Sequence, residues 1–168
     1  MRSHRYEVSL RWTGNEGSGT SNYRAYSRDH ELAGAATVPA LPVDGGVPKP
    51  VILGSSDPAF RGDPTRWNPE ELLVASLAQC HMLWYLHLAT TVGVVVTDYV
   101  DTPFGVMVED GSGAGHFERV VLRPEVTVAD ASMTEAAQAA HHRVGDYCFI
   151  ARSVNFPVEH APTVCLAS

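Results

Sequence analysis

The sequence contains few charged residues, few aromatic residues and only three cysteines, and none of its apolar stretches is long. Three cysteines at wide spacing do not form the disulfide framework of a small secreted protein. No stretch approaches the roughly 20 apolar residues needed to span a bilayer. The basic start, residues 1–7, is not followed by the apolar region of a secretion signal. We therefore expect a cytoplasmic protein whose thiols are reduced.

The charge and the length of the chain limit its partners and its organisation. The formal net charge is -7, and neither nucleic acid nor an anionic membrane attracts an acidic protein. With 168 residues, 45% of them hydrophobic, the chain is long enough to bury one ordinary core. We expect a single domain over residues 1–168.

The first third of the chain predicts two short strands and a long loop. Apolar and polar residues alternate over residues 6–12, which is typical of a half-buried strand. A glycine-rich turn follows, and residues 23–27 are a candidate partner strand. Prolines and glycines then break any long element over residues 29–67. A loop of this length is often functional, and residues 50–54 within it are expected to form a short strand.

The clearest predicted element is a long helix that begins after Asn68. Asn68 is a typical N-cap, Pro69 suits the first helical position, and Glu71 has the spacing of a capping-box acid. We expect the helix to end near Thr91, before Gly93. Its leucines cover more than one face, which indicates burial in an interior or in an interface.

The remainder predicts further strands and a second helix. Ser132 and Glu135 have capping-box spacing for a helix that ends near Val144. Strands are expected over residues 94–101, 105–109, 117–128 and 153–160. This order of elements predicts an α+β fold with mostly antiparallel pairing.

Two cysteines are the first candidates for chemistry. Cys80 lies in the middle of the long helix, and Cys148 follows the second helix. A free cysteine on a buried helix also serves as a small hydrophobic residue, and this alternative stays open. A reactive thiol needs a nearby cation or helix N-terminus. Because Cys80 lies mid-helix, a side chain from elsewhere must supply the charge, whereas Cys165 is expected to be a spectator.

Arginines and one glutamate are candidates for supporting a reactive thiol. The candidate arginines are Arg61 and Arg66 in the long loop, and Arg24 and Arg28 near the predicted second strand. A carboxylate orients such an arginine by bidentate pairing. Glu70 is the candidate, since Glu71 already has a capping role.

The spacing of Glu70 and Cys80 limits how they share a site. Ten residues of helix separate them by about 15 Å along the axis and place them on different faces. Either a long arginine bridges most of that gap, or Glu70 serves the site of a second subunit. The second arrangement fits a helix that is too apolar for a small monomer.

The histidines do not predict a metal site. His81 and His87 are six residues apart on the long helix and therefore point to different sides. No spacing of cysteines and histidines matches a structural zinc pattern. We interpret the histidines as core and surface residues.

The chain resembles the OsmC/Ohr superfamily of osmotically induced and organic hydroperoxide resistance proteins, on its OsmC-like side. The resemblance is carried by Asn68-Pro69-Glu70-Glu71-Leu72-Leu73 with Cys80, and by Cys148-Phe149-Ile150-Ala151-Arg152-Ser153. Trp12-Thr13-Gly14 and Asn155-Phe156-Pro157-Val158 also suit it. His81 departs from the pattern, because an apolar or aromatic residue is more usual after the cysteine. The loop over residues 29–67 also looks long for the superfamily.

The resemblance implies an OsmC-like fold: an intertwined homodimer of curved antiparallel sheets with two central helices and active sites at the dimer interface. It implies that Cys80 is the peroxidatic cysteine and Cys148 the resolving cysteine. It also implies that Glu70 is the orienting acid and Arg61 the supporting arginine, with Arg28 in reserve. The expected activity is reduction of organic hydroperoxides, with a dithiol or lipoyl-type reductant and with no metal, haem or flavin cofactor.

Large side chains near these motifs predict an apolar pocket that favours organic hydroperoxides over hydrogen peroxide. The candidate lining residues are Phe60, Trp67, Met82, Trp84, Tyr85 and Phe149. For each of them the alternative is ordinary core packing. The competing function is a non-catalytic dimer that binds an apolar small molecule in the interfacial pocket and has inert thiols.

Overall fold

The computed structural model describes residues 2–34 and 49–167. The middle of the predicted long loop, residues 35–48, lies outside the described residues. The chain forms two compact units, Met1–Leu72 and Leu73–Ser168, here called the N-terminal and C-terminal units. The expectation of a single domain over residues 1–168 stays a prediction.

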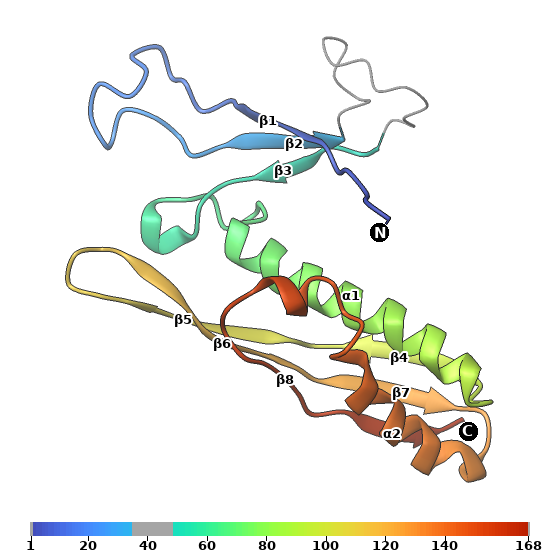
Figure 1. The fold of residues 1–168 in the computed structure, drawn as a ribbon. Helices are drawn as coiled ribbons and strands as arrows, with labels where there is room; N and C mark the ends of the chain where they lie inside the picture. Colours follow the sequence, from blue (N-terminus) through green and yellow to red (C-terminus); the bar gives the residue numbers. More distant parts are fainter. Residues whose placement is uncertain (1, 35–48, 168) are drawn as a thin grey trace. The chain divides into compact units, whose positions relative to one another are not determined.

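The N-terminal unit contains a three-stranded antiparallel sheet in the order β1-β2-β3 (Figure 1). Its strands are β1 (Val8–Trp12), β2 (His30–Gly34) and β3 (Ile52–Gly54). Strands β1 and β3 confirm the strands predicted over residues 6–12 and 50–54. None of the fully buried hydrophobic side chains in the described part of the chain belongs to this sheet.

The predicted partner strand over residues 23–27 is wrong. The Arg28 guanidinium donates hydrogen bonds to the carbonyl oxygens of Tyr26, at 2.6 Å, and Tyr23, at 2.7 Å. The same guanidinium lies over both tyrosine rings, at 4.3 Å from each centroid. These contacts occupy carbonyl groups that a ladder would use. The segment is therefore irregular, and β2, which lies inside the predicted loop, pairs with β1 instead.

Helix α1 (Pro69–Thr91) confirms the predicted long helix. The Glu71 N–H donates to Asn68 Oδ1 at 2.8 Å, and the Asn68 N–H donates to a Glu71 carboxylate oxygen at 3.2 Å. These reciprocal bonds are the predicted capping box. After the helix, Gly93 has a φ of 74°, which a residue with a Cβ rarely adopts.

The apolar composition of α1 requires one correction. It is the one helix in the described part of the chain whose length and hydropathy would suffice to cross a membrane, so the statement that no stretch approaches this length is wrong. However, Leu77, Tyr85 and Leu88 are buried in the core of the C-terminal unit. Core helices of soluble proteins meet the same criterion, so the composition is weak evidence for a membrane.

The C-terminal unit contains two three-stranded sheets of mixed direction, with the strand orders β4-β7-β9 and β5-β6-β8. The β4·β7 and β5·β6 pairs are antiparallel, whereas β8 and β9 add in parallel. The strands are β4 (Val96–Asp101), β5 (Phe104–Glu109), β6 (Gly115–Leu122), β7 (Pro124–Val128), β8 (Val158–His160) and β9 (Thr163–Leu166). An α+β fold with mostly antiparallel pairing is thereby confirmed for the described residues.

The core of the C-terminal unit lies where its two helices meet the strands. Tyr85 and Leu88 of α1 pack with Ala137 and Ala140 of α2 (Thr134–Val144) and with Val126 of β7. Figure 1 shows α1 running along the strands, with α2 beside its C-terminal half. The second helix therefore packs on the first, which brings the segment that follows α2 to the middle of α1.

Three details of this unit differ from the sequence predictions. The strand expected over residues 117–128 is two strands, β6 and β7, which belong to different sheets. The helical segment is capped by Asp130, whose carboxylate accepts from the Ser132 N–H at 2.8 Å, and not by Ser132. The expected strand over residues 153–160 is a strand only at its end, in β8, because a 3₁₀ turn (Ala151–Ser153) ends at its first residue, and β9 was not predicted.

Candidate functional site

The two candidate cysteines lie in contact in the C-terminal unit. Cys80 is half-buried on α1 and packs against the core cluster that contains Cys148. Cys148 is only 2% exposed. Burial, together with the neighbouring Cys80 thiol, raises the pKa of the Cys148 thiol to about 11. Both thiols are free in this structure.

Backbone hydrogen bonds hold Cys148 beside α1. The Cys148 N–H donates to the Val144 carbonyl at 2.9 Å, which continues the last turn of α2. The Ala151 N–H donates to Cys148 Sγ at 3.4 Å, and the Arg152 N–H donates to the Cys148 carbonyl at 3.1 Å. Cys148 is therefore positioned by the turns on both sides of it.

An aromatic cluster lies next to the thiols. The Trp84 ring, one helical turn after Cys80, lies 5.2 Å from the Tyr147 ring and 5.6 Å from the Phe149 ring, measured between centroids. Phe149 is 67% exposed and Tyr147 is 41% exposed. These flanking residues of Cys148 thus form an apolar surface that is open to solvent beside the thiol pair.

The predicted pocket residues divide into three groups. Trp84 and Phe149 meet in the aromatic cluster. Tyr85 is fully buried, and its hydroxyl donates to the Ala137 carbonyl at 3.3 Å, so its packing role is the correct interpretation. Phe60 and Trp67 belong to the N-terminal unit and Met82 is half-buried on α1, and the association of these three with the thiols stays a prediction.

A small enclosed cavity of about 30 Å³ adjoins Cys148. Its lining includes His81 of α1, His160 of β8 and Gly145. This volume holds about one water molecule, so an organic substrate does not fit inside it.

A hydrogen-bonded pair of buried histidines lies beside the thiols, a feature that the sequence did not predict. His81 Nε2 and His141 Nδ1 are 3.0 Å apart. Burial, and to a smaller extent the neighbouring histidines, lower the pKa of His81 to about 4 and that of His141 to about 3. The one available signal was the unusual position of His81, directly after Cys80. Within the described ranges, no group of three or more histidine, cysteine or acidic side chains is arranged to hold a metal ion.

Arg61 lies in a tightly folded turn of the N-terminal unit. The Asp57 carboxylate accepts from the Ala59 N–H at 2.7 Å, and the Arg61 N–H donates to the Pro58 carbonyl at 3.0 Å. A Cβ at Gly62 would overlap the Ser56 carbonyl, so the turn requires glycine there. Among the described residues other than glycine, Arg61 is the one with a positive φ, 67°.

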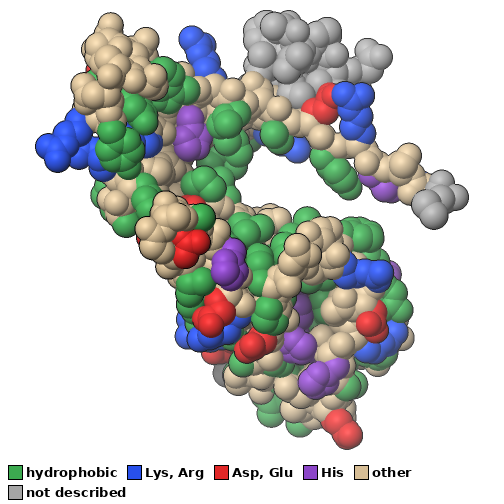
Figure 2. Space-filling model, turned by 60° about the vertical axis from the view of Figure 1, so that its left-hand side comes forward, with side chains coloured by type: hydrophobic (Ala, Val, Ile, Leu, Met, Phe, Trp, Pro, Cys, Tyr) green, Lys and Arg blue, Asp and Glu red, His purple; other side chains and the backbone are tan. Residues whose placement is uncertain are grey.

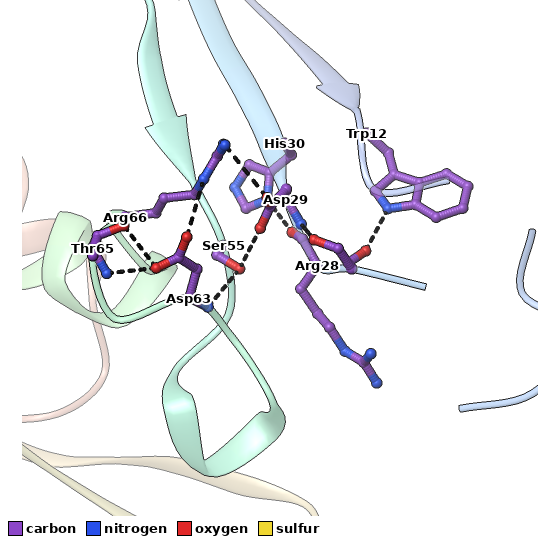
Figure 3. Close-up of polar contacts among 9 residues, drawn as sticks. Trp12, Arg28, Asp29, His30, Ser55, Asp63, Thr65 and Arg66 are labelled. Atoms are coloured by element: carbon purple, nitrogen blue, oxygen red, sulfur yellow. Dashed lines mark hydrogen bonds and ion pairs between the residues drawn. The ribbon is translucent and has the colours of Figure 1, made fainter. Parts of the chain in front are cut away.

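The alternative arginines have structural partners or an exposed position. Arg66 lies 3.4 Å from the Asp29 carboxylate and 3.7 Å from the Asp63 carboxylate, as Figure 3 shows. Arg28 is committed to the tyrosine carbonyls already described. The Arg24 side chain is exposed. Within the part of the chain that the structure describes, Arg61 and Arg24 are the candidates whose side chains make no hydrogen bond or ion pair.

Glu70 lies in the first turn of α1. Because α1 is continuous from Pro69 to Thr91, Glu70 and Cys80 are separated by about 15 Å along its axis. No hydrogen-bond partner for Glu70 Oε2 exists among the described residues. The structure thus brings together Cys80 and Cys148, whereas the association of Arg61 and Glu70 with them stays a prediction.

Comparisons with known proteins agree on one family. Residues 62–162 match the family model described as OsmC-like protein. A search of the curated proteins found no match.

Solved structures are similar over almost the whole chain. An OsmC-like protein of unknown function from Vibrio cholerae is 28% identical, with a TM-score of 0.77 over 95% of this chain and 99% of that one. The organic hydroperoxide resistance protein OsmC from Legionella pneumophila is 14% identical, with a TM-score of 0.63 over 98% and 99%. The organic hydroperoxide resistance protein OhrB of Bacillus subtilis is 17% identical, with a TM-score of 0.57 over 96% and 98%. The last two similarities show the fold alone.

Proposed function

Because this chain belongs to the OsmC-like protein family, we propose that it is a thiol peroxidase that reduces organic hydroperoxides with Cys80 and Cys148. The observation that carries the proposal is the contact between the two free thiols in the C-terminal unit. A disulfide between distant parts of a chain needs this proximity. Two of the similar structures, from Legionella pneumophila and Bacillus subtilis, are those of organic hydroperoxide resistance proteins.

Burial assigns different tasks to the two cysteines. Cys80 is half-buried and Cys148 is buried, so a peroxide reaches Cys80 first. The Cys80 thiolate attacks one peroxide oxygen, the O–O bond breaks, and the organic part leaves as an alcohol after it takes up a proton. Cys80 becomes a sulfenic acid in this step.

The raised pKa of Cys148 keeps this thiol protonated at rest, so that it does not compete with Cys80 for the peroxide. The Cys148 sulfur attacks the Cys80 sulfenic acid, an S–S bond forms, the S–O bond breaks, and water leaves with the Cys148 proton. An external dithiol or lipoyl-type reductant then restores both thiols and is itself oxidised to a disulfide. The reactions run on sulfur alone in a reducing, cytoplasmic compartment.

Arg61 and Glu70 support the first step in this proposal. A guanidinium beside Cys80 stabilises the thiolate, and a carboxylate orients that guanidinium. Both side chains are available for these roles. Among the described residues, the Arg61 side chain makes no hydrogen bond or ion pair, and Glu70 Oε2 has no hydrogen-bond partner. The length of α1 between Glu70 and Cys80 favours a homodimer in which Glu70 serves the partner subunit's site.

The substrate class follows from the surface around the thiols. Trp84, Tyr147 and Phe149 present aromatic rings to solvent beside Cys80 and Cys148. An organic hydroperoxide buries apolar area against these rings, at about 25 cal/mol for each Å² removed from water, and hydrogen peroxide gains nothing there. The same surface would also suit a non-catalytic protein that binds an apolar molecule.

The test is mass mapping of the cysteines after brief exposure of the reduced protein to equimolar cumene hydroperoxide, in parallel with hydrogen peroxide. We expect a rapid Cys80–Cys148 disulfide that forms faster with the organic peroxide. The Cys80→Ser variant is expected to form no disulfide, and Cys148→Ser is expected to accumulate the sulfenic acid. Thiols that stay reduced for minutes would contradict the peroxidase proposal and favour the non-catalytic binding protein.

A further inference from the structure

The histidine pair joins the two elements that carry the thiols. His81 directly follows Cys80 on α1, and His141 lies on α2 seven residues before Cys148. The two side chains are 5% and 0% exposed. A hydrogen bond between His81 and His141 therefore fixes α1 and α2 at the level where the cysteines meet.

The ring geometry is that of a direct hydrogen bond. The planes of the His81 and His141 rings differ by only 11°, their centroids are 5.3 Å apart, and the facing nitrogens are 3.0 Å apart. The two nitrogens thus point at each other and not at a shared third position, as the ligands of a metal would. One ring donates its N–H and the other accepts with its bare nitrogen.

This bond needs both rings to be neutral and well aligned. Burial holds the pKa of each ring far below its ordinary value, so both are neutral at pH 7. Tyr85 stacks on His141 with centroids 3.9 Å apart, which fixes the plane of that ring. The His160 ring lies 6.5 Å from the His141 ring and 5.5 Å from the His142 ring, measured between centroids.

Breaking the bond leaves buried ring nitrogens without partners, which is costlier than losing an exposed hydrogen bond. His141 Nε2 has no hydrogen-bond partner among the described residues. The bond of His141 Nδ1 to His81 is therefore the only side-chain hydrogen bond of that ring among them. Sliding α2 along α1 would break this bond. The pair therefore favours one register of the two helices.

We propose that the His81–His141 hydrogen bond positions the two thiols, because it holds α2 in the register that brings Cys148 to Cys80. The pair thereby sets how strongly the Cys80–Cys148 disulfide is favoured over the dithiol. His81 and His141 act through the helices and are positioning residues. The inference rests on the proposed function only in using the same two cysteines.

The quantity to measure is the equilibrium between the protein and glutathione at pH 7. Two protein thiols lose two protons and two electrons and form one S–S bond, while oxidised glutathione becomes two reduced glutathiones. The equilibrium constant reports how well the folded chain brings Cys148 to Cys80. The protein carries Cys165→Ser so that one disulfide is counted.

Two variants of equal size separate the hydrogen bond from packing. In His141→Asn the amide places a polar atom where His141 Nδ1 lies and retains the bond to His81. In His141→Leu the side chain has about the same size as asparagine, but the hydrogen bond to His81 is lost. We expect His141→Asn to stay within about threefold of the parent constant and His141→Leu to fall about tenfold below it. His116→Leu, an exposed histidine of β6, is the control and is expected to leave the constant unchanged.

Equal constants for His141→Asn and His141→Leu would overturn the proposal, because packing alone would then explain the role of His141. If neither variant folds, His81→Gln and His81→Met give the same comparison, since the glutamine amide reaches the position of Nε2. Unfolding by urea is measured beside each constant. No peroxide enters this experiment, so a protein that ignores cumene hydroperoxide would fail the proposed function and still give a decisive result here.

Discussion

The backbone at Arg61 is held in a conformation that costs a residue with a Cβ roughly 1 kcal/mol. Strain of this kind clusters at functional sites, and here it presents a guanidinium from a rigid turn. Arg61→Gly relieves the strain but makes the unfolded chain more flexible by a similar free energy. We therefore expect the free energy of unfolding to change by less than about 1 kcal/mol.

The same substitution is expected to slow the oxidation of Cys80 at pH 7 by about tenfold or more, because a neighbouring opposite charge shifts an ionisation by about one to three pKa units. Rates are measured by stopped-flow mixing with cumene hydroperoxide. Arg24→Ala is the matched control, an exposed arginine of the same unit that we expect to be neutral. A loss of rate in Arg24→Ala alone would transfer the role to Arg24.

Two adjacent acids at the start of α1 have different tasks. Glu71 closes the capping box with Asn68, so Glu71→Ala is expected to destabilise the fold by about 1 kcal/mol and to leave the oxidation rate unchanged. Glu70→Gln should do the reverse, because Glu70 Oε2 has no partner among the described residues. Urea unfolding and peroxide kinetics of both variants check the contrast. A stability loss in Glu70→Gln without a loss of rate would assign Glu70 a purely structural role.

At the scale of the elements, the contact between α1 and α2 is sensitive to acid. The pKa values of His81, about 4, and His141, about 3, lie below the ordinary 6.5. Between these values the unfolded state binds more protons than the folded state, so the free energy of unfolding falls as the pH falls below 6.5. We expect a loss on the order of 3 kcal/mol per histidine at pH 4.5.

Urea unfolding at pH 7.0, 5.5 and 4.5 measures this loss, and the double variant His81→Met/His141→Leu isolates it. The pKa of His160 is also lowered, by burial and by His142, and that of Asp101 is raised by burial, but these groups remain in both proteins. The double variant should therefore lose less stability on acidification. Parallel curves for the two proteins would refute the assignment.

Local signals explain which elements the sequence predicts well. The start of α1 is encoded by neighbouring residues, the Asn68 cap and the Glu71 acid, and its end by Gly93, so the sequence predicts its bounds almost to the residue. The error over residues 23–27 arises because the adjacent Arg28 side chain occupies the carbonyl groups of this segment, which the alternation pattern does not indicate. Strand β9 is four residues long and depends on parallel pairing with β7, which no local pattern indicates.

The candidate site was predictable in part for the same reason. Motif spacing identified Cys80 and Cys148 as candidates, but their contact depends on how α2 packs on α1. The His81–His141 pair joins residues 60 positions apart, and two histidines with no metal-like spacing carry no sequence signal for it. The choice of Arg61 among four arginines rests on the resemblance and stays a prediction, whereas the partners of Arg66 and Arg28 are evident only in the folded N-terminal unit.

At the scale of the whole molecule, the exposed apolar side chains call for a partner. Leu10 of β1 and Leu53 of β3 are 66% and 48% exposed, and Leu83 of α1 is 62% exposed. Figure 2 shows apolar side chains at the surface of both units. Exposed apolar area of this kind marks association surfaces. A second copy of the chain is the partner that the proposed function favours.

Mixed dimers test whether Glu70 serves the site of the partner subunit. Cys80→Ser and Glu70→Gln chains are co-expressed with different tags, and the mixed dimer is purified through both. Each inactivated residue then lies on a different chain. If Glu70 acts across the interface, the Cys80 of one chain meets the intact Glu70 of the other, and one of the two sites works. Without this purification, random pairing of the two variant chains would make roughly a quarter of all active sites complete.

The purified mixed dimer is therefore expected to show about half of the parent's rate with cumene hydroperoxide, although each variant alone is nearly inactive. If Glu70 acts within its own chain, the mixed dimer contains no complete site and is as inactive as the dimer of either variant alone. A monomer at micromolar concentration in analytical ultracentrifugation would exclude the shared site altogether. In that case, a long arginine would have to span the distance from Glu70 to Cys80 within one chain.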